Sequence, residues 1–133
     1  MSLRWDCIKN GCYKDNCIPD WGFLEEIFIR GIRPTDIDGT VEINGYFLFL
    51  EWKNKTGKLS TAQSWYFERL TKLSDKITVY IFYGDSLLKP PIIEKIQIIK
   101  NGNIGKINPG DLKTGIVMCT KWNNYVNNQK GSA

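Results

Sequence analysis

The stretch PTDIDGTVEINGYFLFLEWK, residues 34–53, decides how this chain of 133 residues folds. Asn44 and Gly45 both tolerate the positive φ angles of a two-residue hairpin turn, and they separate two runs rich in β-branched and aromatic residues. Pro34 excludes a helix at the start of the stretch and favours an extended backbone. The stretch therefore predicts a β-hairpin of two antiparallel strands.

Carboxylates occur on both predicted strands of this hairpin. Asp38 and Glu51 lie about equally far from the turn, so antiparallel pairing brings them roughly opposite each other. Side chains alternate along a strand, which places Lys53 on the same face as Glu51 and Trp52 on the other face. Facing carboxylates repel unless a cation lies between them, and oxygen ligands of this kind suit Mg²⁺ or Mn²⁺. We therefore expect a divalent metal site beside Lys53.

Two other acidic residues share the face of Asp38. Glu42 is about 13 Å from Asp38 at ~3.3 Å per residue, which is too far to bind the same ion. Asp36 is nearer, roughly 7 Å by the same rise, and could act through a water molecule. A lone Glu-x-Lys sequence is common, and the alternative is that these acids are exposed strand residues with Lys53 in a surface salt bridge. The aspartate strand, the hairpin and the helix predicted after it together favour the metal site.

Asp38, twelve intervening residues and the sequence Glu51-Trp52-Lys53 resemble the PD-(D/E)xK pattern of the restriction-endonuclease-like nucleases. The resemblance covers roughly residues 20–83. The sequence LSTAQ at residues 59–63 is similar to the helix start with a glutamine in the VRR-NUC and Holliday-junction-resolvase-like branches. The likeness is to small phage and prophage nucleases of this superfamily. The first half of the pattern departs from the family, because Asp36 and Asp38 compete for one role; the apolar residue and the glycine around Asp38 favour Asp38.

The resemblance implies an α/β fold with a restriction-endonuclease-like core, a central mixed sheet flanked by helices in αβββαβ order. A single domain would span residues 1–133, with a cysteine-containing segment at 1–18, the catalytic core at 19–83, and peripheral strands and a C-terminal helix at 84–133. The implied activity is that of a metal-dependent nuclease that hydrolyses phosphodiester bonds in DNA, in phage or prophage DNA processing.

The resemblance also implies roles for the residues of the pattern. Mg²⁺ (or Mn²⁺) would be held by Asp38, Glu51 and the backbone carbonyl of Trp52. The metal would orient and acidify a water molecule and neutralise phosphate oxygens. Lys53 would position that water and offset the charge that develops in the transition state.

Two further residues are candidates for the site. In the nucleases that the chain resembles, a glutamate on the helix before the aspartate strand can help to hold the metal or its waters. Glu25 is the candidate here, and the alternative is that it lies on a solvated helix face. Gln63 would contact a metal-bound water or the scissile phosphate, or equally a backbone carbonyl.

Periodicity predicts the other elements of the fold. Apolar residues at helical spacing predict helices from Asp20 through WGFLEEIFIR, from Ser60 to about Ser74, and from Asp111 through Val126. A β-branched run predicts a strand over residues 77–83, which a right-handed crossover can place parallel to the Glu-x-Lys strand. Residues 92–100 alternate like a strand, with a turn at residues 101–103, and we expect this strand to be peripheral.

Composition narrows the class of protein. The 18 Lys and Arg exceed the 14 Asp and Glu, and the net charge of +4 mildly supports a polyanionic partner such as DNA. The chain has no histidine, which excludes Ser-His and Cys-His catalysis. The sequence shows neither an apolar run of membrane-spanning length nor a signal-peptide core, so we expect a cytoplasmic protein, in the host cell if it is a phage protein, and no membrane partner. A homodimer is left open.

Four cysteines would be reduced thiols in such a compartment: Cys7, Cys12, Cys17 and Cys119. The first three are separated by four residues each, and this spacing is a weak zinc signal. We therefore expect neither a disulfide nor zinc.

Two other classes of function stay open. A nucleic-acid-binding module with the same fold would bind without cleaving, and a structural phage protein would carry the strand acids incidentally. Four basic residues would contact phosphates equally well in a nuclease and in a binding module: Lys55, Lys58, Arg69 and Lys72. Only the nuclease needs the acidic pair together with its lysine.

Overall fold

The computed structural model of the protein describes residues 20–129. The chain divides between Asp36 and Ile37 into two compact units. The first unit contributes the described residues 20–36. The second contributes residues 37–129, which contain the β-strands and α-helices of the described chain.

Residues 20–36 contain two short 3₁₀ helices, η1 (Gly22–Leu24) and η2 (Ile29–Gly31), and the prediction of an α-helix after Asp20 is wrong. The carboxylate of Asp20 accepts a hydrogen bond of 2.8 Å from the backbone N–H of Gly22. This bond closes a local turn at the position where the predicted helix would begin.

Two features of this segment explain why its apolar period does not produce an α-helix. Glu26 and Arg30 have positive φ angles of 68° and 56°, and left-handed residues interrupt a right-handed helix. The apolar side chains of the predicted stripe are exposed, with Phe23 at 74% and Ile27 at 65%. An amphipathic helix is stabilised mainly by burying its stripe, so a stripe that stays exposed contributes little.

The hairpin forms as predicted. β1 (Gly39–Ile43) pairs antiparallel with β2 (Tyr46–Lys53), and Asn44 and Gly45 make the turn with φ angles of 53° and 83°. Two consecutive positive φ angles are typical of a type I′ turn, whose twist matches that of the two strands.

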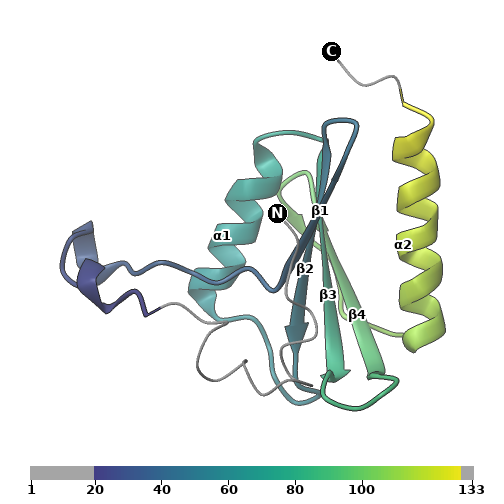
Figure 1. Ribbon diagram of the computed structural model, residues 1–133, viewed down its shortest axis with the longest axis horizontal. Coiled ribbons are helices and arrows are strands. Elements are labelled where there is room, and N and C mark those ends of the chain that lie inside the picture. The colour runs from purple at the N-terminus through teal and green to yellow at the C-terminus, as the bar shows by residue number, and fades with distance from the viewer. Residues whose placement is uncertain (1–19, 130–133) are drawn as a thin grey trace. The chain divides into compact units, whose positions relative to one another are not determined.

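The rest of the sheet is built outward from β2 (Figure 1). The chain leaves β2 through α1 (Thr61–Lys72) and returns as β3 (Ile77–Asp85), which lies parallel to β2 as predicted. Strand β4 (Ile92–Lys100) pairs antiparallel with β3. Two short strands, β5 (Asn103–Ile104) and β6 (Asn108–Pro109), pair with β4, and α2 (Leu112–Asn127) follows them.

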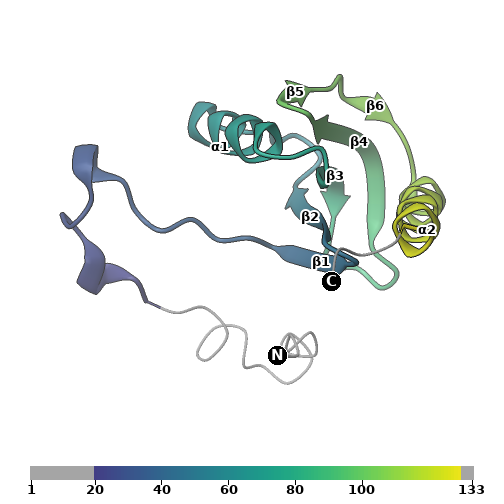
Figure 2. The ribbon, with the colours of Figure 1, turned by 90° about the horizontal axis from the view of Figure 1, so that it is seen from above.

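The result is a six-stranded mixed sheet with the path β1-β2-β3-β4-β5, and Figure 2 shows α1 and α2 on opposite faces of it. The prediction of an α/β protein with a mixed sheet flanked by helices is confirmed. The αβββαβ order is not seen in the described residues, because two strands rather than three precede α1 and no α-helix precedes them. None of the helices in residues 20–129 has the length and apolar character of a membrane span.

Strand β4 lies inside the sheet, between β3 and the two short strands, and not at the periphery where we expected it. Its Ile93 and Ile96 are buried on the face towards α2, and its Ile99 is buried on the face towards α1. Pro90 and Pro91 before it lie in the loop between β3 and β4. A strand buried on both faces needs apolar residues at both parities, and the five isoleucines of β4 supply them.

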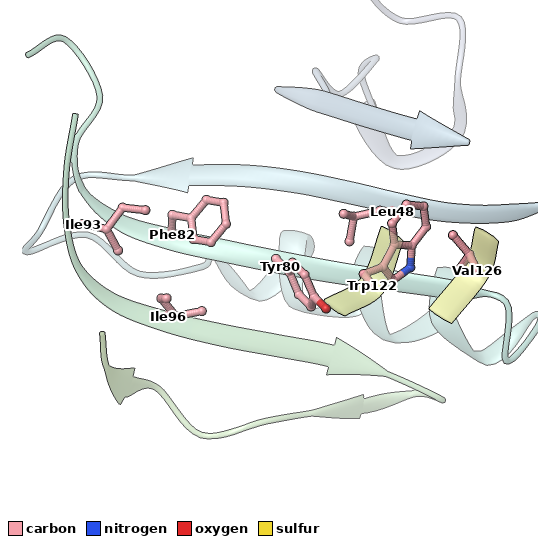
Figure 3. Packing of buried hydrophobic residues seen from close by; sticks show 7 residues of the cluster. All are labelled: Leu48, Tyr80, Phe82, Ile93, Ile96, Trp122 and Val126. Atoms are coloured by element: carbon pink, nitrogen blue, oxygen red, sulfur yellow. The ribbon is translucent and has the colours of Figure 1, made fainter. Parts of the chain in front are cut away.

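Each face of the sheet carries a hydrophobic cluster. The α2-face cluster, drawn in Figure 3, consists of Leu48, Tyr80, Phe82, Ile93, Ile96, Trp122 and Val126. The α1-face cluster consists of Phe67, Val79, Ile81, Tyr83 and Ile99. Alternate residues of β3 thus enter opposite clusters, as expected of a central strand.

Both α-helices begin at the predicted capping residues. The Ser60 hydroxyl accepts a hydrogen bond of 3.1 Å from the backbone N–H of Gln63, whose side-chain oxygen accepts one of 3.2 Å from the backbone N–H of Ser60. Asp111 and Thr114 form the same reciprocal pair at the start of α2. The backbone N–H of Thr114 donates to the Asp111 carboxylate and lowers the pKa of this group. Such capping boxes fix where a helix starts.

Candidate functional site

Asp38 lies immediately before β1 and interacts with the main chain of β2. Gly39 is paired with Leu50, so Asp38 is next in register to Glu51. The exposed Asp38 carboxylate accepts a hydrogen bond of 2.8 Å from the backbone N–H of Trp52 through Oδ2. The side chain of Asp38 therefore takes the place of a main-chain acceptor just before β1 begins. This bond holds the carboxylate beside the end of β2.

Glu51 occupies the adjoining position in the interior of the sheet. It is 7% exposed, and its neighbour on β3 is Ile81, a member of the α1-face cluster. Lys53, two residues further along β2, lies on the same face and is half-buried. The structure thus places an exposed aspartate, a buried glutamate and a half-buried lysine at one end of β2.

The backbone carbonyl of Trp52 is directed towards the same end of the site. In a β-strand the N–H and C=O of one residue point to the same side. The N–H of Trp52 reaches Asp38, so its carbonyl also points to the β1 side of β2. β1 begins only at Gly39, and its pairing with β2 stops at Leu50. The carbonyl therefore lies beyond the paired part of the hairpin.

These donors fit a hard divalent cation. They are two carboxylates, Asp38 and Glu51, and one main-chain oxygen, which are the ligand types of Mg²⁺ and Mn²⁺. Residues 20–129 contain no group of three or more Asp, Glu, Cys or His side chains that could hold a metal. Mg²⁺ usually binds through one or two carboxylates and completes its coordination with waters and substrate phosphates. The small number of protein ligands is therefore compatible with that ion.

Gln63 caps helix α1 with its side-chain oxygen, while its side-chain amide N–H groups are not used in the cap. Its side-chain oxygen belongs to the capping box with Ser60. Because α1 runs antiparallel to β2 and β3 in the crossover, the first turn of α1 lies at the end of the sheet where β2 stops. Gln63 is therefore at the same end as Lys53, with its amide N–H groups as donors.

Glu25 and Asp36 belong to the other unit of the chain. Glu25 Oε1 is 2.8 Å from Arg33 Nη2, and both side chains of this ion pair are exposed. Within residues 20–36 the carboxylate of Glu25 is therefore paired with the guanidinium of Arg33. Its expected role at the metal stays a prediction, as does a contribution from Asp36.

A polar network on the α1 face of the sheet was missed by the sequence analysis. The Tyr83 hydroxyl donates a hydrogen bond of 2.7 Å to Oε1 of Gln97, and Nε2 of Gln97 donates one of 2.9 Å to the carbonyl of Gly105. Tyr83 pairs with Lys53 on one side and with Lys95 on the other. The Lys95 ammonium lies 5.8 Å from the centre of the Tyr83 ring, and burial raises the pKa of Tyr83.

One signal could have revealed this network. Gln97 lies at an odd-numbered position of residues 92–100, as do the isoleucines at positions 93 and 99, so an alternating strand would bury it with them. A buried polar side chain needs a hydrogen-bond partner within the fold. Nothing in the sequence identifies the partner as Tyr83, because the two residues meet only through the pairing of β3 with β4.

The cysteines add little to the site. Cys119 is a half-buried free thiol on α2, and burial raises its pKa. Cys7, Cys12 and Cys17 lie outside the described residues, so the structure does not test whether they bind zinc.

Comparison with protein-family models, with curated proteins and with solved structures found no match to this chain.

Proposed function

We propose that the protein is a metal-dependent nuclease that hydrolyses phosphodiester bonds in DNA, with Asp38, Glu51 and the backbone carbonyl of Trp52 as ligands of Mg²⁺ or Mn²⁺. The observation that carries the proposal is the 2.8 Å hydrogen bond from the Trp52 N–H to Asp38. It holds one carboxylate beside the end of β2, the strand that carries Glu51 and Trp52. We further propose that β1, β2, α1 and β3 are the central part of a restriction-endonuclease-like core.

The chain's own residues supply positioning and positive charge. A bound divalent cation would acidify a water molecule and neutralise phosphate oxygens. The N–H of Trp52 orients the Asp38 carboxylate. The Lys53 ammonium provides a fixed positive charge near the phosphate, where charge develops during hydrolysis. Lys55 and Lys58, both exposed in the loop after β2, provide contacts for neighbouring phosphates.

A second candidate function is nucleic-acid binding without cleavage. On the outer side of α1 the guanidinium of Arg69 lies 5.5 Å from the centre of the Trp65 ring, and Trp65 is 54% exposed. Exposed aromatic and basic side chains together form the stacking surfaces of single-strand-binding proteins. Arg69, Lys72 and the two loop lysines are all exposed and serve this function as well as the first.

Cleavage assays on variants of Asp38 separate the two functions. Asp38→Asn keeps an oxygen acceptor for the Trp52 N–H but removes the charge, whereas Asp38→Ala removes both. We expect each variant to lose Mg²⁺-dependent cleavage by about 100-fold or more, because a charged ligand is lost. Only Asp38→Ala should also lower the free energy of unfolding, by about 1 kcal/mol for the lost hydrogen bond. The measurements are DNA cleavage on single-stranded, duplex, nicked, flap and branched substrates, and thermal unfolding.

Three further variants complete this test. Glu51→Gln should abolish cleavage, and Lys53→Ala should reduce turnover while metal affinity is largely kept. Asp36→Ala should cleave better than Asp38→Ala, because Asp36 acts at most through a water. Wild-type activity in Glu51→Gln, or metal-independent binding with no cleavage of any substrate by the wild type, would refute the nuclease and favour the binding module.

A further inference from the structure

A cavity of about 550 Å³ lies at the carboxyl ends of the parallel strands β2 and β3. Its walls come from the end of β2 and the loop after it, from the end of β3 and the loop after it, and from the start of β4: Trp52, Asn54, Lys55, Thr56, Gly84, Asp85, Ser86, Leu87, Ile92 and Glu94. The carboxyl ends of parallel strands are the usual place for ligands in α/β sheets, and the volume is in the range of small-molecule sites.

Trp52 forms a rigid wall of this cavity. Its indole N–H donates a hydrogen bond of 3.3 Å to the carbonyl of Gly84, and its ring lies 5.7 Å from that of Phe82 at an interplanar angle of 61°. Gly84 is at a register irregularity between β3 and β4, and a Cβ there would clash with the carbonyl of Ile92. The backbone around the indole is therefore closely packed. A ring held in this way can contact a planar ligand without losing much conformational entropy.

The charged side chains of the cavity are mainly acceptors. Asp85 and Glu94 contribute two carboxylates against one ammonium, from Lys55. Among the described residues neither Asp85 nor Glu94 forms an ion pair, so neither carboxylate is neutralised by a directly bonded cation. Asp85 Oδ1 accepts a hydrogen bond of 3.0 Å from the backbone N–H of Leu87, which orients this carboxylate. The excess negative charge disfavours a phosphate inside the cavity and favours a neutral ligand with N–H donors.

We propose that this cavity binds an unpaired nucleobase that carries an exocyclic amino group, namely cytosine, adenine or guanine. Trp52, with Leu87 and Ile92, provides the apolar surface for the ring, and Asp85 and Glu94 accept hydrogen bonds from the amino group. Carboxylates pair with the amino group of cytosine in the same way when proteins read DNA bases. Thymine and uracil, which present carbonyl oxygens at that position, would face the carboxylates with lone pairs.

The position of the base relative to the cleavage site rests on the proposed function. The main chain of Trp52 belongs to the proposed metal site, and its indole lines the cavity. Trp52 thus contributes to both sites, but its indole has the opposite parity to Glu51 and Lys53. A base that flanks the scissile phosphate would enter the cavity where the DNA strand passes the end of β2. Entry into the cavity requires that the base be unpaired, because a base inside the duplex stack cannot reach an enclosed pocket. The preferred substrate would be single-stranded or locally unpaired DNA.

Free nucleosides test the cavity without any cleavage. Cytidine and uridine form a matched pair that differs at the amino group, as do adenosine and inosine. Each is titrated into the full-length protein in the presence of EDTA, and ¹H–¹⁵N NMR spectra follow the amides of Asn54, Thr56 and Ser86 and the indole N–H of Trp52. We expect shifts at these groups, with cytidine bound about 10- to 150-fold more tightly than uridine, the value of one hydrogen bond to a charged acceptor.

Variants connect the preference to the carboxylates. Glu94→Gln removes one of the two charged acceptors, at an exposed position, and should lower the cytidine-to-uridine ratio. Glu68→Gln, on α1 and away from the cavity lining, is the matched control and should leave the ratio unchanged. Trp52→Phe should weaken all nucleosides, and its thermal unfolding shows whether the fold is kept.

Several results would overturn the proposal: equal affinity for cytidine and uridine, shifts confined to residues outside the cavity, or a ratio in Glu94→Gln equal to that of the wild type. Failure of the proposed function is a different result. A protein that binds cytidine in the cavity but cleaves no DNA in Mg²⁺ keeps this inference and loses the nuclease. One that cleaves DNA but shows no nucleoside shifts keeps the nuclease and loses this inference.

Discussion

The two faces of the sheet bury different kinds of side chain. The α2-face cluster is made of apolar and aromatic residues such as Leu48, Phe82 and Val126 (Figure 3). On the opposite face Glu51 and Gln97 are each only 7% exposed beside the α1-face cluster. Burying a polar group costs free energy unless it is hydrogen-bonded or paired, whereas burying hydrocarbon stabilises the fold. The α2 face therefore relies on hydrocarbon burial, whereas the α1 face relies on interactions of its buried polar groups, such as the hydrogen bonds of Gln97 to Tyr83 and Gly105.

Strand β2 carries this difference in a single element. Leu48, Leu50 and Trp52 pack with the α2-face cluster. Glu51 and Lys53 have the opposite parity, and the proposed chemistry depends on them. Natural proteins depart from good packing mainly at functional sites. The contrast between the faces is thus independent support for a site at the end of β2, because it does not depend on any motif.

The largest effect on stability should come from the α2 face. Leu48 is 2% exposed, and Leu48→Ala should lower the free energy of unfolding by about 3 kcal/mol through lost burial and a residual cavity. Its cross-strand partner Val41 is 38% exposed, so Val41→Ala should cost about 0.5 kcal/mol or less. Chemical denaturation of both variants measures the two costs. Similar costs for the two would mean that the packing of the α2 face is not what stabilises the sheet.

The next prediction compares the loss of stability on removing one tyrosine hydroxyl from each face of the sheet. Tyr83→Phe leaves the side-chain oxygen of buried Gln97 without its donor and should cost about 1–2 kcal/mol. The hydroxyl of Tyr80, on the α2 face, has no hydrogen-bond partner among the described residues, so Tyr80→Phe should change the free energy of unfolding by about 0.5 kcal/mol or less. Equal costs at neutral pH would show that the Tyr83–Gln97 bond contributes nothing.

Tyr83→Phe and Tyr80→Phe should also change how the free energy of unfolding depends on pH above pH 10. Burial raises the pKa of both tyrosines above the ordinary value of 10.0, with the Cys119 thiol adding to the effect at Tyr80. The folded state then holds these protons more tightly than the unfolded state. This contribution to stability is fully present below pH 10 and is lost as the pH rises through the folded pKa. Each Phe variant should therefore lose stability less steeply than the wild type above pH 10.

Local signals in the sequence were sufficient for much of the fold. Asn44 and Gly45 predicted the turn because few residues tolerate two positive φ angles, and Ser60 and Asp111 predicted the helix starts because their side chains replace missing backbone acceptors. Register then followed from parity, which placed Asp38 beside Glu51. These features depend on interactions between residues close in sequence or joined by a tight turn.

The failures all concern interactions that the local sequence does not contain. The period of residues 21–30 was that of a helix, but its stripe stays exposed, so nothing compensates for the cost of ordering it. The central position of β4 and the bond between Tyr83 and Gln97 depend on which strands pair. The cavity at Trp52 arises from two loops and three strand ends that meet only in the folded chain.

The smallest effect on stability belongs to Gln63, where two tasks can be separated. Its side-chain oxygen caps α1, and its amide donors lie at the end of β2. Gln63→Glu keeps the capping box, since glutamate serves equally at this position, but replaces the donors with a charge that repels phosphate. We expect its free energy of unfolding to change by about 0.3 kcal/mol or less and its cleavage to fall.

Ser60→Ala should do the reverse: it removes the cap at a cost of about 1 kcal/mol and keeps the donors, so cleavage below the unfolding temperature should persist. The free energy of unfolding and the cleavage rate are measured on both variants. Cleavage by Gln63→Glu at the wild-type rate would show that Gln63 serves only to start the helix.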